Sequence, residues 1–147
     1  MKLAAPSHEH LENFLREFYQ DSTLRLPIIR FHGGALARLV TRALRIGAIT
    51  FGRHVLISPE LIKTDSSGRR SAPGWLVAHE AVHVLQYERE GYARFLMHYL
   101  MGYWRALRES GKWGREARMN AYLSIAEERA AQEVERAYQA RGRETKP

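Results

Sequence analysis

The chain has 147 residues, 45% of them hydrophobic and 27% charged, which is typical of one soluble globular domain with a single core. The absence of cysteine excludes a disulfide framework and a thiolate metal site, and no run of about 18 apolar residues is present to form a transmembrane helix. The formal net charge of +7 favours acidic partners, but the basic residues are spread along the chain, so we expect no specific nucleic-acid binding.

The two ends of the sequence set the expected domain limits. Residues 1–6 hold one lysine and no apolar stretch, unlike a signal peptide, so we expect a cytoplasmic protein. We expect residues 1–147 to form a single domain, with an N-terminal helix and connector at residues 1–27 and a disordered tail at residues 141–147.

The first predicted element is a helix from Ser7 to Gln20, for which Ser7 is a suitable N-cap. His8 and His10 are two residues apart and do not share a helix face, so we expect them to be exposed and not to bind metal. The apolar residues of this helix recur at the spacing i, i+3, i+4 and i+7: Leu11, Phe14, Leu15 and Phe18.

Three short runs rich in β-branched residues predict strands: Ile28–His32, Ala48–Phe51 and His54–Ser58. A helix from about Ala35 to Arg45 is expected between the first two runs. The Gly52-Arg53 pair suits a hairpin or a bulge between the last two. A polar loop from Lys63 to Ala72 follows.

The next predicted helix begins near Pro73, ends near Glu90 and contains the motif His-Glu-x-x-His at residues 79–83. Residues i and i+4 lie on one helix face, so His79 and His83 can offer two imidazole nitrogens to one zinc ion. Glu80 projects about 100° round the helix from His79, beside the metal, where it can take a proton from a metal-bound water. The motif therefore predicts a zinc site with a general base.

Two histidines on a helix can also be core residues whose ring nitrogens have ordinary partners. This helix, however, is apolar on nearly every side, so we expect it to be buried all round. Burying two imidazoles and a carboxylate without partners costs several kcal/mol, and one metal ion would satisfy both imidazoles. We therefore favour the metal interpretation.

A second long helix is predicted from Tyr92 to Leu107, followed by a polar loop at residues 109–119 and a last helix from about Ser124 to Ala140. We expect the apolar residues of the Tyr92–Leu107 helix to pack against the metal helix. The alternative is an amphipathic helix on a membrane surface, because the stretch is rich in aromatic residues.

A catalytic zinc site needs a third protein ligand, and Glu127 and Glu128 are the candidates. Periodicity favours Glu127, because its helix face is the more apolar one, with Ala130, Ala131, Val134 and Tyr138. Both glutamates could instead be exposed first-turn residues that interact with the helix dipole.

Three segments in this order resemble a known family: Ile29–His32, Ala48–Val55 and His79–Gln86. They are similar to the metallopeptidase domain found as the core domain of extracellular contractile injection systems, and to small bacterial relatives of it. That family has a strand ending in histidine, a small-residue helix, a threonine–glycine hairpin and a His-Glu-x-x-His-x-x-Gln helix. More broadly, the chain resembles a minimal gluzincin-like zincin over roughly residues 28 to 135.

The resemblance bears on the third ligand. The relatives carry their third glutamate in a Tyr-x-x-Asn-Pro-x-Glu-x-x-Ala pattern, in which Tyr122, Glu128 and Ala131 match this chain. Ile125 and Ala126 depart from the pattern, so Glu127 stays an alternative. The resemblance implies that zinc is bound by His79, His83 and Glu128.

The expected fold is α+β, a small zincin-like domain. About three strands from residues 28 to 58 pack on a helical part that carries the metal helix. In such folds an edge strand can bind extended peptide by strand addition, and His54–Ser58 is our candidate for that edge. Tyr122 and His54 are candidates for a group that stabilises an oxyanion.

The expected function is a zinc-dependent metallopeptidase that hydrolyses peptide bonds with a zinc-activated water and Glu80 as general base. Its cofactor would be Zn²⁺ and its partner a peptide or protein substrate. The alternative is a non-catalytic or latent protein-binding module that zinc stabilises.

Overall fold

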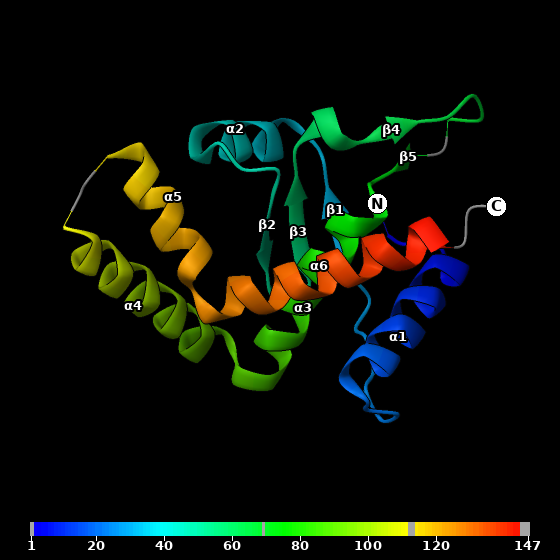
Figure 1. Cartoon of the computed structure of the whole chain (residues 1–147). Coiled ribbons are helices and arrows are strands. Elements are labelled where there is room, and N and C mark those ends of the chain that lie inside the picture. The colour runs from blue at the N-terminus through cyan, green and yellow to red at the C-terminus, as the bar shows by residue number, and fades with distance from the viewer. Residues whose placement is uncertain (1, 69, 112–113, 145–147) are drawn as a thin grey trace.

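The computed structural model describes residues 2–68, 70–111 and 114–144 (Figure 1). Its α-helices are α1 (Ala5–Tyr19), α2 (Ala35–Leu44), α3 (Gly74–Glu90), α4 (Tyr92–Ser110), α5 (Arg115–Ser124) and α6 (Ala126–Glu144). Its strands are β1 (Arg30–His32), β2 (Ala48–Phe51), β3 (His54–Ile57), β4 (Lys63–Thr64) and β5 (Arg70–Ser71), with a 3₁₀ turn, η1 (Pro59–Leu61), after β3. A small sheet joined to a larger helical part confirms the predicted α+β class.

The main sheet has three strands in the order β1, β3, β2. β1 runs parallel to β3 with Phe31 opposite Val55, and β2 pairs antiparallel with the other side of β3 with Thr50 opposite Val55. Gly52 turns the predicted β2–β3 hairpin with a φ of 57°, which glycine adopts without strain.

The prediction that His54–Ser58 forms the peptide-binding edge is wrong, because β3 is paired on both sides. The burial of the two hairpin strands agrees with this strand order. Val55 and Ile57 of β3 are fully buried, whereas Phe51 at the end of β2 is 47% exposed. β3 is therefore the central strand and β2 is an edge of the sheet.

The hydrophobic core lies between the sheet, α1, α3 and α6 (Figure 1). Each of these elements contributes a fully buried side chain, for example Leu15 from α1, Val55 from β3, Ala81 from α3 and Val134 from α6. α6 packs along α3, and β2 also contacts α3. This packing brings the first turn of α6 and the edge strand β2 to the histidine motif.

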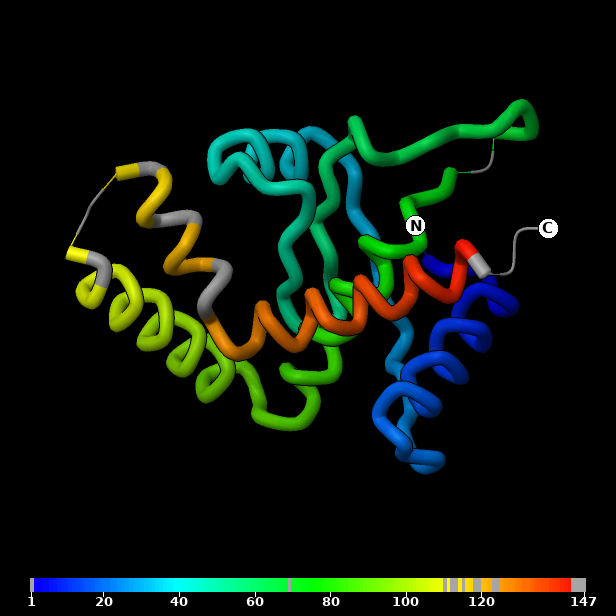
Figure 2. The backbone as a smooth tube through the Cα atoms, in the orientation of Figure 1, coloured from blue at the N-terminus to red at the C-terminus, as the bar shows by residue number. Residues whose placement is uncertain are grey.

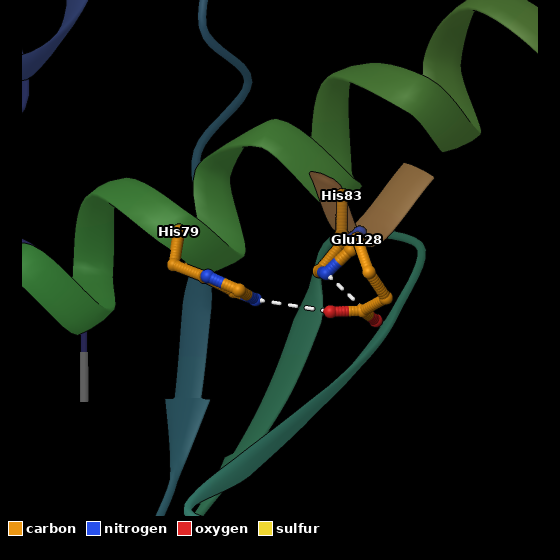
Figure 3. A group of neighbouring side chains, drawn as sticks. All are labelled: His79, His83 and Glu128. Carbon is orange, nitrogen blue, oxygen red and sulfur yellow. Dashed lines mark ion pairs between the residues drawn. The ribbon is translucent and has the colours of Figure 1, made fainter. Parts of the chain in front are cut away.

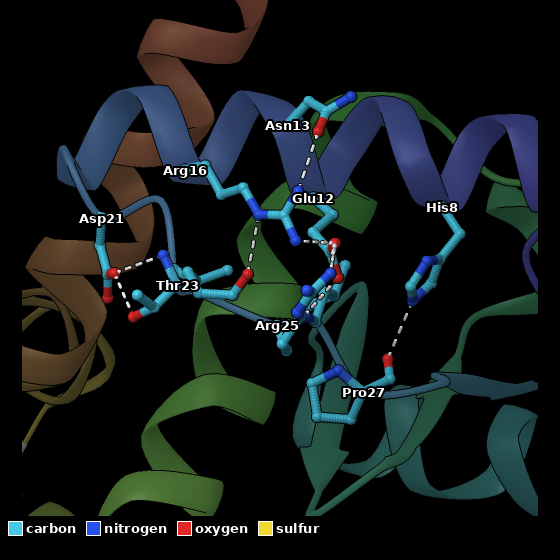
Figure 4. A network of polar contacts seen from close by, with 10 residues as sticks. His8, Glu12, Asn13, Arg16, Asp21, Thr23, Arg25 and Pro27 are labelled. Carbon is cyan, nitrogen blue, oxygen red and sulfur yellow. Dashed lines mark hydrogen bonds and ion pairs between the residues drawn. The ribbon is translucent and has the colours of Figure 1, made fainter.

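A set of polar contacts holds the connector between α1 and β1 (Figure 4). A carboxylate oxygen of Glu12 accepts a hydrogen bond from the Leu26 backbone N–H at 2.8 Å. His8 is half-buried, and its Nε2 lies 3.3 Å from the carbonyl oxygen of Pro27. His8 therefore belongs to the connector and not to the histidine motif.

The first half of the chain departs from prediction at the start of α1 and in the loop after η1. α1 begins at Ala5 with Ala4 as N-cap, so Ser7 lies inside the helix. Proline fits the first turn of a helix because its missing N–H has no partner there, and Pro6 occupies that position. The predicted polar loop from Lys63 to Ala72 contains the short antiparallel pair β4–β5.

The second half departs from prediction in two places. The predicted loop at residues 109–119 is interrupted by α5, because the strong helix formers that follow Gly114 outweigh the local glycines. α6 continues to Glu144, so residues 141–144 of the predicted disordered tail are helical, and residues 145–147 lie outside the described residues. Arg141 contributes to this extension, because it pairs with Glu17 of α1.

α4 and α5 form a hairpin that projects from the rest of the molecule (Figure 2). It has a small core of its own, formed by Leu107, Ala117 and Ala121. The predicted packing of α4 on α3 holds for Phe95, whose ring centroid lies 4.1 Å from that of Tyr87. It is wrong for much of the helix, whose exposed apolar residues include Leu96, Met97, Leu100 and Met101. No helix among the described residues is long and apolar enough to cross a membrane.

Candidate metal centre

Three side chains from two helices converge on one another (Figure 3). His79 and His83 lie one turn apart on α3, and Glu128 comes from the first turn of α6. The Nε2 atom of His79 lies 3.5 Å from Oε2 of Glu128, and the Nε2 atom of His83 lies 3.4 Å from Oε1. His83 and Glu128 are buried, and His79 is half-buried.

Glu128 joins this group, whereas Glu127 does not. Ala131 and Val134 are fully buried in the core that α6 shares with α3, and Glu128 precedes Ala131 by three residues on that same side. Glu127 meets the motif only through its backbone carbonyl, which accepts a hydrogen bond from the Gln86 side chain at 3.2 Å. Periodicity did not single out Glu128, because Glu127 and Glu128 both share a helix face with Ala131.

The outer nitrogen of each imidazole has an oxygen partner. Nδ1 of His79 lies 3.1 Å from Oε2 of Glu135, and Nδ1 of His83 lies 2.8 Å from Oε1 of Gln86. The orientation of the Gln86 amide is fixed because its nitrogen donates to the Glu127 carbonyl. Both partners accept hydrogen bonds, so each Nδ1 carries a hydrogen and each Nε2 is left to bind a cation.

The site has the donor chemistry of a cation site. Two Nε2 atoms face a carboxylate, and Oε2 of Glu128 is buried with no hydrogen-bond partner among the described residues. Ligands about 2.1 Å from a tetrahedral ion are about 3.4 Å apart, which agrees with the two nitrogen–oxygen distances. His79, His83 and Glu128 could therefore hold a metal ion.

Charge within the group is strongly coupled. Burial lowers the pKa of His83, but its hydrogen bond to Glu128 and the charge of that carboxylate outweigh burial and raise the pKa to about 9. Burial raises the pKa of Glu128, but the adjacent imidazoles of His79 and His83 outweigh burial and hold the pKa well below its usual range. Without a metal, His83 and Glu128 therefore form an ion pair at neutral pH.

Glu80 lies in the same cavity and is held by the sheet. Its side chain is buried, and its Oε2 accepts a hydrogen bond of 2.6 Å from the Thr50 hydroxyl of β2. The cavity has a volume of about 110 Å³, and Glu80, His83, Glu128 and Thr50 all line it. The edge strand β2 therefore forms one wall of the space beside the motif.

Two tyrosines line the cavity beside Glu128. The Tyr99 hydroxyl donates to Oε1 of Glu128 at 2.9 Å. Burial, followed by the negative charge of Glu128, raises the pKa values of both Tyr99 and Tyr122. His54, the other predicted oxyanion donor, lies elsewhere, because its exposed ring contacts His32 at 2.9 Å between the two ring nitrogens.

Sequence reasoning missed three residues of this arrangement: Thr50, Tyr99 and Glu135. Glu135 had a usable signal, because it follows Glu128 by seven residues and so lies on the same helix face two turns later. Thr50 and Tyr99 had none, because their roles depend on how β2 and α4 pack against α3 and α6.

Comparison with known proteins agrees with the first half of this arrangement. The model of the eCIS core domain family matches residues 9–91, more than half of the chain, from α1 to the end of α3. The match includes both motif histidines but ends before Glu128, so it is shorter than the resemblance expected from the sequence. No curated protein and no solved structure matches the chain. The chain belongs to the eCIS core domain family.

Proposed function

We propose that this protein is a zinc-dependent metallopeptidase, with His79, His83 and Glu128 as metal ligands and Glu80 as general base. The observation that carries the proposal is the convergence of two imidazole Nε2 atoms on a buried carboxylate, with a second carboxylate in the same cavity. Two imidazoles and one carboxylate are a ligand set of catalytic zinc sites, which keep a fourth position open.

The chain's own residues supply the remaining parts of such a reaction. When bound, zinc would act as a Lewis acid and lower the pKa of a water in its open position toward about 7. Glu80 would take the proton of the attacking water and pass it to the leaving amine, while the Thr50 hydroxyl keeps its carboxylate in place. Tyr122 lines the cavity and is our candidate for donating a hydrogen bond to the developing oxyanion.

The substrate would be a peptide or protein in extended conformation. β2 borders the cavity and pairs only with β3 among the described residues, so its outer edge can accept an added strand. The exposed Phe51 side chain at the end of β2 lines the same cavity and would contact a substrate residue.

One observation favours the rival function, a non-catalytic module stabilised by zinc. The cavity of about 110 Å³ is smaller than the roughly 300–1,000 Å³ of typical small-molecule sites. In that case the same three ligands would hold the fold together, and a partner would cover the site without being cleaved.

The Glu80→Gln variant separates the two functions. We expect it to keep zinc and its fold but to lose about 10²- to 10⁴-fold in the rate of cleavage of a fluorogenic casein substrate, because amide nitrogen and oxygen cannot take up the proton. The matched control is Glu127→Gln on α6, which should keep both zinc and activity. A zinc-loaded wild type that cleaves no faster than Glu80→Gln would support the binding module.

A further inference from the structure

The outer face of α4 is apolar and exposed to solvent. Its side chains form two adjacent rows at i, i+4 spacing, Leu96–Leu100–Trp104 and Met97–Met101. Their exposed fractions are 47% for Leu96, 54% for Met97, 46% for Leu100, 64% for Met101 and 52% for Trp104. We call these five residues the α4 face. Contiguous exposure of this kind marks an interaction surface, whereas scattered single residues would not.

The charge beside the α4 face is mostly positive, because Arg105 and Arg108 line the hollow over it together with one carboxylate among the described residues, Glu109. Residues 91–108 contain no aspartate or glutamate. Arg105 and Arg108 follow Met101 and Trp104 by four residues each, so they continue the two rows and form the C-terminal edge of the α4 face. An apolar stripe with a basic edge is the pattern of a helix that lies in a membrane interface.

The shape of the surface also favours a bilayer over a peptide. The hollow over the α4 face is lined, among the described residues, by side chains of α4. The hairpin projects from the rest of the molecule, which leaves α4 free to lie along a flat surface (Figure 2). Trp104 is the C-terminal residue of the α4 face, next to the arginines, and tryptophan is favoured at the level of lipid headgroups.

We propose that α4 binds the surface of an anionic lipid bilayer. The α4 face would insert among the headgroups and the upper acyl chains, and the arginines at its edge would contact lipid phosphates. Leu96 belongs to the α4 face and also lines the cavity beside the metal centre. Binding would therefore place that cavity next to the membrane surface. The proposal does not depend on metal binding or on peptidase activity.

Vesicle cosedimentation of the full chain tests the proposal, with and without added zinc. We expect the wild type to bind vesicles of phosphatidylglycerol and phosphatidylcholine in equal parts. It should bind pure phosphatidylcholine vesicles at least about tenfold more weakly, because each arginine near an anionic surface strengthens binding about fivefold, and rising salt should weaken binding. Equal binding to both kinds of vesicle would overturn the proposal.

Two double variants test the surface. Leu100→Ser with Met101→Ser, and Arg105→Gln with Arg108→Gln, should each weaken binding about tenfold or more. The matched control is Leu36→Ser with Leu39→Ser. These leucines are 64% and 68% exposed on α2, beside Arg38 and Arg42, and their loss should leave binding unchanged. Retained binding in the α4 variants, or an equal loss in the α2 variant, would contradict the assignment.

Fluorescence locates the contact. Emission from Trp104 should shift to shorter wavelength on vesicle binding, and Trp104→Phe should remove the shift while most of the sedimentation remains. A shift that survives in Trp104→Phe would place the contact at another tryptophan and overturn the proposal. If the wild type does not bind vesicles but forms dimers or binds a soluble poly-glutamate peptide, the α4 face binds a protein partner instead of a bilayer.

Discussion

In each imidazole of the candidate metal centre, the two ring nitrogens face different partners. The Nε2 atoms face Glu128, and the Nδ1 atoms contact Glu135 and Gln86. Such outer contacts set which nitrogen carries the hydrogen and how the ring is oriented. The geometry of the site therefore depends on two residues that would not touch the metal.

Glu135 gives the first prediction at this scale. Replacing Glu135 by Ala should weaken zinc affinity about 10- to 100-fold, because His79 loses the partner that orients its ring. The measurement is competition with a chelating dye. Glu133→Ala is the matched control, since Glu133 is exposed on the same helix, and its affinity should equal that of the wild type. Equal affinity in Glu135→Ala would mean that this contact does not orient the ring.

The neighbouring pair Glu127 and Glu128 gives a second prediction. Glu128→Ala should lose more zinc affinity than Glu135→Ala, because two imidazoles and water are a weak ligand set. Glu127→Ala should lose little, since its side chain lies outside the converging group. The same dye competition ranks the two. If Glu127→Ala is the more damaging change, the placement of α6 on α3 is incorrect.

The ion pair between His83 and Glu128 predicts how zinc affinity depends on pH. The pKa of His83 is raised to about 9, so zinc must displace a proton below that pH. Affinity should rise about tenfold per pH unit between pH 7 and pH 9 from this group alone. Equilibrium titration at pH 7, 8 and 9 measures it, and a flat profile over this range would contradict the ion pair.

The same pair acts on stability with a defined sign when metal is absent. A histidine whose pKa is raised by folding contributes stability that is fully present below its unfolded pKa of about 6.5 and is lost as the pH rises through about 9. Glu128 has a lowered pKa, so its contribution is present above its unfolded pKa of about 4.3 and is lost as the pH falls below it.

At the scale of elements, the contact between β2 and α3 carries a prediction. Thr50→Val removes the hydroxyl that donates to buried Glu80 and should cost about 1–3 kcal/mol of unfolding free energy. Thr50→Ser keeps a donor and should recover much of the loss. Chemical denaturation of zinc-free protein measures both. If Thr50→Val is as stable as Thr50→Ser, the hydrogen bond is not what joins the strand to the helix.

The elements that local residues mark were predicted well. Features that depend on contacts between distant segments were harder to infer. α3 and the β2–β3 hairpin were predictable because apolar runs, Pro73 and Gly52 mark their limits within a few residues. The strand order was not, since the sequence of a hairpin does not tell which strand meets β1. The exposure of α4 was also not predicted, because an apolar stripe has the same sequence pattern whether it packs in the core of the protein or faces outward.

At the scale of the whole molecule, the candidate metal centre joins the two halves of the chain. Its histidines lie within residues 9–91, which match the family, whereas Glu128 lies beyond them on α6. A metal at this point would therefore stabilise the packing of α6 on α3 in the folded state only. Removing it should lower the melting temperature by mass action, and a melting curve unchanged by verified chelation would show that the site is not coupled to folding.

The measurement that tests the metal centre most directly is the zinc content of the purified chain, determined by elemental analysis. We expect about one zinc per wild-type chain, and almost none after His83→Ala, since the change removes a ligand supplied by the centre of α3. Circular dichroism of the variant would confirm that its helices are retained. A wild type that is free of metal and takes up no added zinc would contradict the account.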